Sequence, residues 1–197
     1  MPTWTTEDSI PTTRSLPCSD MVLTLTGFMG SGKTTTGKNL AERLGCAFLD
    51  LDQVIEEAQG MTIPEIFATQ GEAAFRAAEL EALEKLLENE SKSGKINLVL
   101  ALGGGTLMTP ECERLVREKT LCVYLKASVE TLLGNLEGTQ SSRPMLGGQD
   151  LRTRIEALLE EREETYARCA EITVENNESP LDELIPLLHV PDTELEG

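Results

Sequence analysis

Residues 27–34 read GFMGSGKT and match the spacing G-x-x-x-x-G-K-[ST] of a phosphate-binding loop. The apolar run over residues 21–26 predicts a buried strand before the loop, and Leu40, Ala41 and Leu44 share one face of a predicted helix behind it. In such a unit, backbone N–H groups surround a phosphate and the helix N-terminus adds a positive dipole. The motif therefore predicts an α/β protein that binds a nucleoside triphosphate. A chance match in a glycine-rich turn is the alternative, and the flanking strand and helix argue against it.

The side chains of the loop have separate expected roles. Lys33 is expected to reach the β- and γ-phosphates, and the Thr34 hydroxyl to ligate a magnesium ion. The residues expected to hold the nucleotide phosphates are Gly30, Ser31, Gly32, Lys33, Thr34 and Thr35.

Apolar runs and helical patterns alternate along the rest of the chain. Further strands are expected at 46–49, 96–102, 121–125 and 172–174, and helices around 54–58, 72–90, 110–118, 129–136, 151–170 and 181–188. This alternation predicts parallel βαβ units with right-handed crossovers. The expected fold is a three-layer αβα arrangement around a five-stranded parallel sheet, in which ligands bind at the carboxyl ends of the strands.

One domain is expected over residues 21–190. Residues 1–20 are rich in Thr, Ser and Pro and predict a disordered N-terminal extension, and residues 191–197 predict a flexible tail. Residues 138–149 are polar and rich in glycine, which predicts a mobile lid at about residues 137–150.

Composition excludes several classes of protein. The formal net charge of −17 argues against nucleic-acid binding, because no basic surface is available to release counterions. No apolar run approaches the roughly 20 residues of a membrane span. The five cysteines are scattered without a C-x-x-C pair, which favours reduced thiols and a cytoplasmic location. His189 is the only histidine and lies in an apolar stretch, so we expect no imidazole catalysis.

Asp50 and Asp52 follow the second predicted strand. If that strand continues through both residues, their carboxylates point to the same side of the sheet. One can then serve magnesium through its water shell while the other accepts a proton from a substrate hydroxyl. The alternative is a structural role as the N-cap of the next helix.

A triple glycine and three arginines complete the candidate site. Gly103-Gly104-Gly105 ends the third predicted strand, so that a small ligand can lie against bare backbone, with a flexible turn as the alternative. Arg143 lies in the predicted lid, where a guanidinium can neutralise charge on a transferring phosphoryl group. Arg76 and Arg162 lie in predicted helices. Both are candidate site residues, and the alternative for each is a surface ion pair.

Taken together, these residues resemble one family, the shikimate kinases of the nucleoside-monophosphate-kinase-like P-loop group. The resemblance extends from residue 21 to about residue 188. Its elements are 27–35, 49–52 with Ile55-Glu56, 60–63, 65–67, Gly71-Glu72 with Phe75-Arg76 and Glu79, 102–105, 143–146, and Arg162 with Tyr166.

The resemblance implies ATP-dependent phosphorylation of the 3-hydroxyl of shikimate, a step toward chorismate and the aromatic amino acids. It implies that Lys33, Asp52 and Arg143 are catalytic, with Asp52 as the base, and that Arg143 also contacts the nucleotide. It implies one Mg²⁺ ion, ligated by Thr34 with Asp50 in its outer shell. The residues implied to bind shikimate are Asp52, Arg76, Gly103, Gly104, Gly105 and Arg162. ATP and shikimate are the expected partners, and we expect a monomer.

Two positions depart from the family's pattern. Leu136 stands where the lid often carries an arginine that packs on adenine, so the adenine contacts are expected to differ. Glu164 replaces a proline between Arg162 and Tyr166, which allows the helix to continue. Another small-molecule kinase, such as gluconate kinase, and a non-catalytic nucleotide-binding regulator are the alternatives. The two arginines and the triple glycine favour a cyclic carboxylate, and the intact phosphate-binding loop argues against the regulator.

Overall fold

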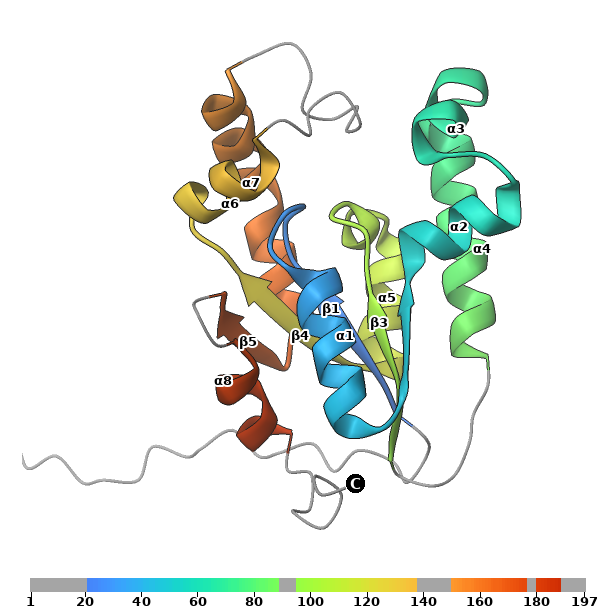
Figure 1. The fold of residues 1–197 in the computed structure, drawn as a ribbon. Coiled ribbons are helices and arrows are strands. Elements are labelled where there is room, and N and C mark those ends of the chain that lie inside the picture. The colour runs from blue at the N-terminus through green and yellow to red at the C-terminus, as the bar shows by residue number, and fades with distance from the viewer. Residues whose placement is uncertain (1–20, 89–94, 138–149, 177–179, 189–197) are drawn as a thin grey trace, which may run out of the picture.

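The computed structural model describes residues 21–88, 95–137, 150–176 and 180–188 (Figure 1). They form a five-stranded sheet with the strand order β2-β3-β1-β4-β5, and every pair of neighbours is parallel. The strands are β1 (Met21–Thr26), β2 (Ala47–Asp50), β3 (Ile96–Ala101), β4 (Thr120–Lys126) and β5 (Ile172–Glu175). The helices are α1 (Lys33–Leu44), α2 (Leu51–Gln59), α3 (Ile63–Thr69), α4 (Glu72–Leu87), the 3-10 turn η1 (Thr106–Met108), α5 (Pro110–Lys119), α6 (Val129–Leu136), α7 (Leu151–Cys169) and α8 (Pro180–Leu187). The predicted fold class is confirmed.

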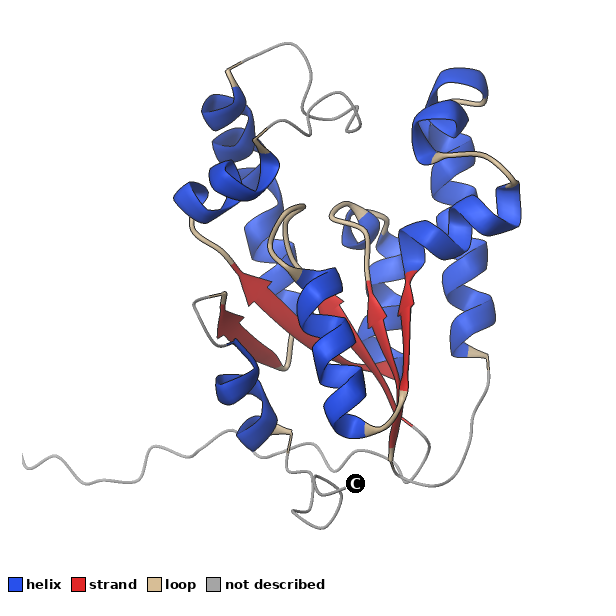
Figure 2. Cartoon of the chain, in the orientation of Figure 1, coloured by secondary structure: helices blue, strands red, loops and turns tan. Residues whose placement is uncertain are grey.

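Helices cover both faces of the sheet and produce the three predicted layers (Figure 2). Along β4, Leu121, Val123 and Leu125 point into the core under α1 and α8. Cys122 and Tyr124, which alternate with them, point into the core under α5 and α7. Burial on both faces explains why the strands read as continuous apolar runs rather than as alternating patterns.

The carboxyl ends of β1, β2 and β3 lie at one edge of the sheet. β1 runs into the phosphate-binding loop, β2 ends at Asp50, and β3 leads into the triple glycine. From β1 the chain moves toward one edge of the sheet to form β2. From β3 it moves toward the opposite edge to form β4. This change of direction is a topological switch point, where open α/β sheets bind their ligands.

Three details differ from the sequence-based expectation. β2 ends at Asp50 and α2 begins at Leu51, so the strand does not continue through Asp52. No helix was expected at α3, whose first turn contains Pro64, a position that suits proline. A capping box between Thr62 and Glu65 starts that helix. α4 ends at Leu87, short of the predicted residue 90.

Several predictions fall outside the described residues. They concern the N-terminal extension, the lid residues 138–149 with Arg143, and the C-terminal tail with His189. Among the cysteines that the structure describes, Cys46, Cys112, Cys122 and Cys169 are free thiols. None of the helices in the described ranges combines the length and hydrophobicity that a membrane crossing requires.

Candidate active site

The phosphate-binding loop connects β1 to α1 at the centre of the sheet. Gly27 has a φ of 140°, and a Cβ added there would lie 2.5 Å from the carbonyl oxygen of Leu125, so only glycine fits. Gly32 forms the N-cap of α1 and no side chain caps that helix. The N-terminus of α1 therefore faces the loop without a capping side chain at Gly32, and a helix N-terminus of this kind can bind an anion.

Lys33 is buried at the start of α1. Its Nζ donates hydrogen bonds to the carbonyl oxygens of Gly27, at 2.8 Å, and Phe28, at 2.9 Å. The ammonium group therefore lies within the curve of the loop. The hydroxyl of Ser31 is also buried in the loop, and within the described residues it has no hydrogen-bond partner.

Thr34 and Asp50 bring two oxygen ligands together beside the loop. The Thr34 hydroxyl donates to Oδ2 of Asp50 at 2.8 Å. The other carboxylate oxygen of Asp50 accepts the backbone N–H of Asp52 at 3.2 Å and caps α2. Asp50 thus serves the structural role considered from the sequence and still presents a carboxylate to Thr34. A hydroxyl and a carboxylate are hard oxygen donors of the kind that Mg²⁺ uses beside nucleotide phosphates.

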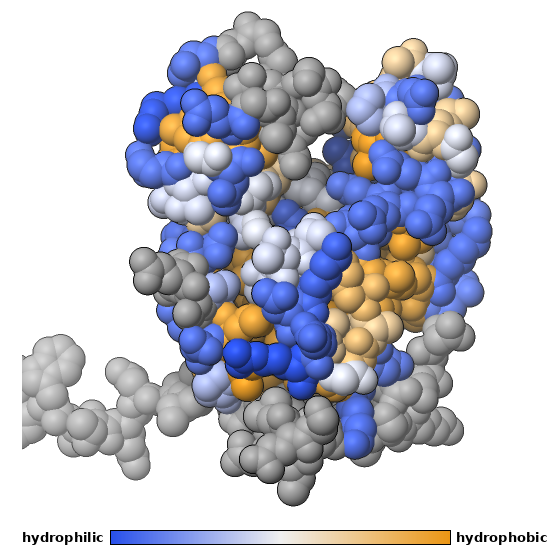
Figure 3. All heavy atoms as spheres, viewed as in Figure 1, coloured by the Kyte–Doolittle hydropathy of each residue, from blue (hydrophilic) through white to orange (hydrophobic). Residues whose placement is uncertain are grey.

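A cavity of about 290 Å³ opens next to the loop, on the side of α2, α3 and α4. In Figure 3 the surface is hollowed between these helices and the side of α6 and α7. The cavity is lined by Met29, Asp52, Glu56, Ile63, Pro64, Phe67, Phe75, Arg76, Glu79, Gly103, Gly104, Gly105 and Arg162. Every residue predicted to bind the acceptor therefore lies in its wall.

Arg76 reaches the cavity from α4 and is held by two carboxylates. Its Nη1 lies 2.7 Å from Oε2 of Glu79, and its Nη2 lies 3.4 Å from Oε1 of Glu72. Glu79 is only 1% exposed, and its second oxygen accepts the hydroxyl of Thr106 at 2.7 Å. Arg76 thus forms with Glu72 the surface ion pair considered from the sequence. Its other partner, Glu79, is buried and fixes the guanidinium.

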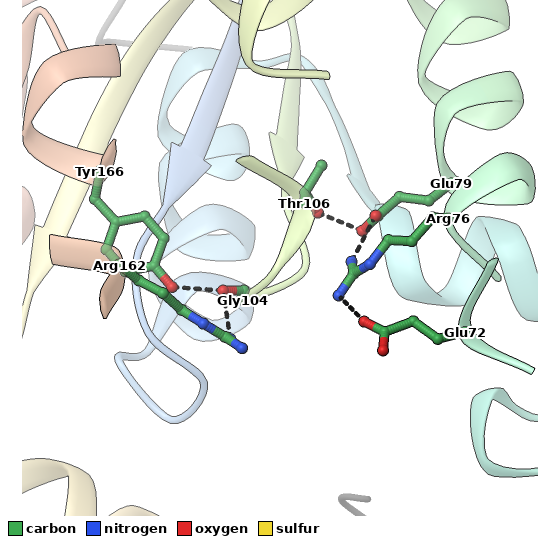
Figure 4. Close-up of polar contacts among 7 residues, drawn as sticks. All are labelled: Glu72, Arg76, Glu79, Gly104, Thr106, Arg162 and Tyr166. Atoms are coloured by element: carbon green, nitrogen blue, oxygen red, sulfur yellow. Dashed lines mark hydrogen bonds and ion pairs between the residues drawn. The ribbon is translucent and has the colours of Figure 1, made fainter. Parts of the chain in front are cut away.

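Arg162 reaches the cavity from the opposite wall, on α7. Figure 4 shows the guanidinium groups of Arg76 and Arg162 extending toward each other on either side of the glycine loop. Nη1 of Arg162 donates to the carbonyl of Gly104 at 3.2 Å, and the hydroxyl of Tyr166 donates to the same oxygen. Burial raises the pKa of Tyr166 to about 12, so the phenol stays protonated as a donor. Nε of Arg162 is buried and has no partner within the described residues.

The triple glycine is required for space rather than for backbone conformation. None of its residues has a positive φ. A Cβ on Gly103 would lie 2.7 Å from Oδ1 of Asp52, and one on Gly105 would lie 2.7 Å from Nη2 of Arg76. The bare backbone therefore lets the two functional side chains close the cavity.

Asp52 lies in the first turn of α2 with its carboxylate against Gly103. Burial, followed by the negative charge of Asp50, raises its pKa from 3.8 to about 6, although the charge of Lys33 opposes the shift. A carboxylate with this pKa is ionised at neutral pH and still accepts a proton more readily than an ordinary aspartate. The structure thus places a carboxylate of raised pKa beside the phosphate-binding loop.

The two departures from the family's pattern have different outcomes. Leu136 is fully buried, and a Cβ on Gly30 would lie 2.9 Å from its side chain, so it packs on the phosphate-binding loop. Glu164 is exposed within α7, and that helix continues to Cys169 as expected.

Sequence reasoning assigned no role to Glu79, Thr106, Asn135 or Asn176. Glu79 lies three residues after Arg76 in a helix, which is a spacing typical of ion pairs. Asn135 and Asn176 carry no local signal, because their contacts with the carbonyls of Gly30 and Ser31 join distant segments of the chain.

A central phosphate-binding loop in a parallel sheet, with Asp52 and two arginines in the adjoining cavity, defines a P-loop kinase of a small molecule. The sequence profile of the shikimate kinase family matches residues 29–188. The chain belongs to the shikimate kinase family.

Individual relatives agree with this assignment. A shikimate kinase of Zymomonas mobilis is 42% identical over 83% of this chain and 88% of the relative. One of Chlorobium limicola is 43% identical over 78% of this chain and 77% of the relative. Among solved structures, a shikimate kinase from Acinetobacter baumannii in complex with shikimate has a TM-score of 0.77 and 35% identity, covering 86% of this chain and 91% of that one. A shikimate kinase from Bacteroides thetaiotaomicron has a TM-score of 0.76 and 31% identity, covering 86% and 99%.

Proposed function

We propose that this protein transfers the γ-phosphoryl group of ATP to the 3-hydroxyl of shikimate. The observation that carries the proposal is the pair of arginines, Arg76 and Arg162, on opposite walls of a cavity beside the phosphate-binding loop. Each charged hydrogen bond to a carboxylate contributes on the order of 1.5–3 kcal/mol. Two such arginines favour a small hydroxylated acid over a neutral polyol.

In the proposed reaction the acceptor carboxylate binds between the arginines and its ring lies against the triple glycine. Asp52 accepts the proton of the attacking hydroxyl as that oxygen bonds to the γ-phosphorus. The bond between this phosphorus and the bridging oxygen breaks, and ADP leaves with the bridging oxygen. Lys33 lies within the loop, where its charge stabilises the β- and γ-phosphates.

We propose that one Mg²⁺ ion joins the nucleotide at Thr34 and Asp50. The 2.8 Å contact between their oxygens supports a site with few protein ligands, the rest being phosphate oxygens and water. The ion supplies neutralising charge at the phosphates. Arg143, outside the described residues, is proposed to approach the same phosphates from the lid. We further propose a monomeric, cytoplasmic enzyme.

A coupled assay of ADP release tests the proposal with shikimate, with gluconate and without an acceptor. We expect turnover with shikimate, and none with gluconate or without an acceptor. Turnover with gluconate but not shikimate would assign the cavity to a different acceptor. ATP binding without turnover on either compound would favour the regulatory alternative. Wild-type protein with EDTA in place of Mg²⁺ serves as the matched control for the metal.

A further inference from the structure

We propose that Asn176, assisted by Asn135, is a positioning residue for the phosphate-binding loop. Nδ2 of Asn176 donates to the carbonyl of Ser31 at 2.8 Å, and Nδ2 of Asn135 donates to the carbonyl of Gly30 at 2.9 Å. The inference goes beyond the proposed acceptor, because it concerns only how the protein prepares the loop for phosphate.

Asn176 is itself fixed by the sheet. It follows the last residue of β5, and its backbone N–H donates to the carbonyl of Lys126 at 2.6 Å, which extends the pairing of β5 with β4. Its side chain is half-buried and lies against Gly32, where a Cβ would approach Nδ2 to 3.0 Å. The amide therefore acts on the loop from a rigid support.

The direction of one peptide plane shows what this bond does. In a trans peptide the C=O and the N–H of the next residue point in opposite directions. The bond from Asn176 turns the Ser31 carbonyl toward β5, so the N–H of Gly32 points the other way. Within the described residues that N–H donates to no acceptor. An N–H held in this way, next to the uncapped start of α1, is ready to bind a phosphate oxygen.

Asn135 supports the preceding peptide plane, between Gly30 and Ser31, through a more exposed hydrogen bond. With the Gly30 carbonyl bound to Asn135, the N–H of Ser31 points back and donates to the carbonyl of Phe28 at 3.1 Å. This closes the turn of the loop on itself. Asn135 is exposed, whereas Asn176 is half-buried, so water replaces the bond of Asn135 more easily. We therefore expect a larger effect from Asn176.

Together with Lys33, the two asparagines hold four loop carbonyls, those of Gly27, Phe28, Gly30 and Ser31. When phosphate binds, the ammonium group of Lys33 can exchange the carbonyls of Gly27 and Phe28 for phosphate oxygens. The asparagine bonds do not involve the ligand and can persist. Without them the loop must be ordered by the phosphate itself, and that cost lowers the affinity.

The test compares Asn176→Ala and Asn135→Ala with Asn39→Ala, a control at an exposed asparagine of α1. Titration calorimetry measures the Kd of Mg-ATP, of Mg-tripolyphosphate, which has no base, and of shikimate. For Asn176→Ala we expect the Kd of ATP and of tripolyphosphate to rise by the same factor, roughly fivefold for one net hydrogen bond. Asn135→Ala should raise both by a smaller factor, and the shikimate Kd should stay at the wild-type value.

Three outcomes would overturn the proposal. A loss of ATP affinity with unchanged tripolyphosphate affinity would make Asn176 a contact of the base. Equal losses for ATP, tripolyphosphate and shikimate would indicate general destabilisation. Unchanged affinities would show that the loop needs no such support. Since no acceptor takes part in the nucleotide titrations, these outcomes are distinct from failure of the proposed function, which would appear as absent turnover of the wild-type protein.

Discussion

Glu79 holds Arg76 at 2.7 Å inside the wall of the cavity, and the carboxylate is almost completely buried. Burying a carboxylate is unfavourable unless it is paired and hydrogen-bonded, and here Arg76 and Thr106 provide both partners. Glu79 therefore fixes the guanidinium of Arg76 in the wall of the cavity, and the positive charge of Arg76 balances the buried carboxylate. In the proposed function the same arginine serves both shikimate binding and stability, and the two roles can be separated by mutation.

Arg76→Met should weaken shikimate binding and also destabilise the protein, because Glu79 is left buried without its cation. We expect a loss of about 3 kcal/mol in the free energy of unfolding. In the double variant Arg76→Met/Glu79→Gln, stability should largely return while shikimate affinity stays low. Urea unfolding and shikimate titration measure the two effects. A double variant as unstable as the single one would contradict the balance of charge described here.

Asp52→Asn should abolish turnover while ATP binding survives. In the wild-type protein, kcat/KM for shikimate should fall about tenfold per pH unit below pH 6, because the pKa of Asp52 is about 6 and the base must be ionised. Measurement of kcat/KM from pH 5 to pH 8 checks this. Near-normal turnover of the variant would remove Asp52 from the role of base.

The same pKa predicts the sign of a stability effect. The folded protein raises the pKa of Asp52 from 3.8, so the carboxyl binds its proton more tightly when folded. Its contribution to stability is present below about pH 4 and is lost as the pH rises through 6. Asp52→Asn should therefore be at least as stable as the wild type at pH 7.5. A thermal midpoint that is lower at pH 7.5 than that of the wild type would contradict the cause given for the shift.

Gly105→Ala should mainly affect shikimate binding, whereas Gly27→Ala should mainly affect stability. A Cβ at Gly105 meets the flexible end of Arg76 at 2.7 Å, so the guanidinium can move away. We expect a tenfold or greater rise in the KM for shikimate, on the order of 1.4 kcal/mol, with a smaller loss of stability than at Gly27. At Gly27 the Cβ meets the backbone of Leu125 at 2.5 Å with φ at 140°, so stability itself should fall. Thermal denaturation and steady-state kinetics of both variants make the comparison.

Tyr166→Phe should keep the ring, which packs on Tyr124 with 5.4 Å between centroids, and lose the bond to Gly104. Arg162 then remains as the only described donor to that carbonyl. We expect a loss of about 1 kcal/mol, divided between stability and the KM for shikimate, with the KM for ATP unchanged. An effect on ATP alone would show that the tyrosine acts elsewhere.

The candidate site was predictable where its residues carry a local signal. The phosphate-binding loop, Asp50 with Asp52, and the triple glycine each lie at the end of an apolar run, and parallel strands bring such ends to one edge. The substrate-binding roles of Arg76 and Arg162 were assigned by resemblance, because an arginine in a helix next to glutamates has no pattern of its own. No helix was expected at α3, where Pro64 lies in the first turn; proline breaks a helix in its interior but fits this position.

The sequence by itself determined the α/β alternation, the buried strands and the loop, because each of these features depends on residues that are close together along the chain. Only the tertiary structure decided how the loop is supported. The contact between Asn176 and Ser31 joins residues 145 positions apart, and that between Asn135 and Gly30 joins residues 105 apart. It also decided that Leu136 packs on the loop, because the partners of a side chain are set by which elements meet at the edge of the sheet.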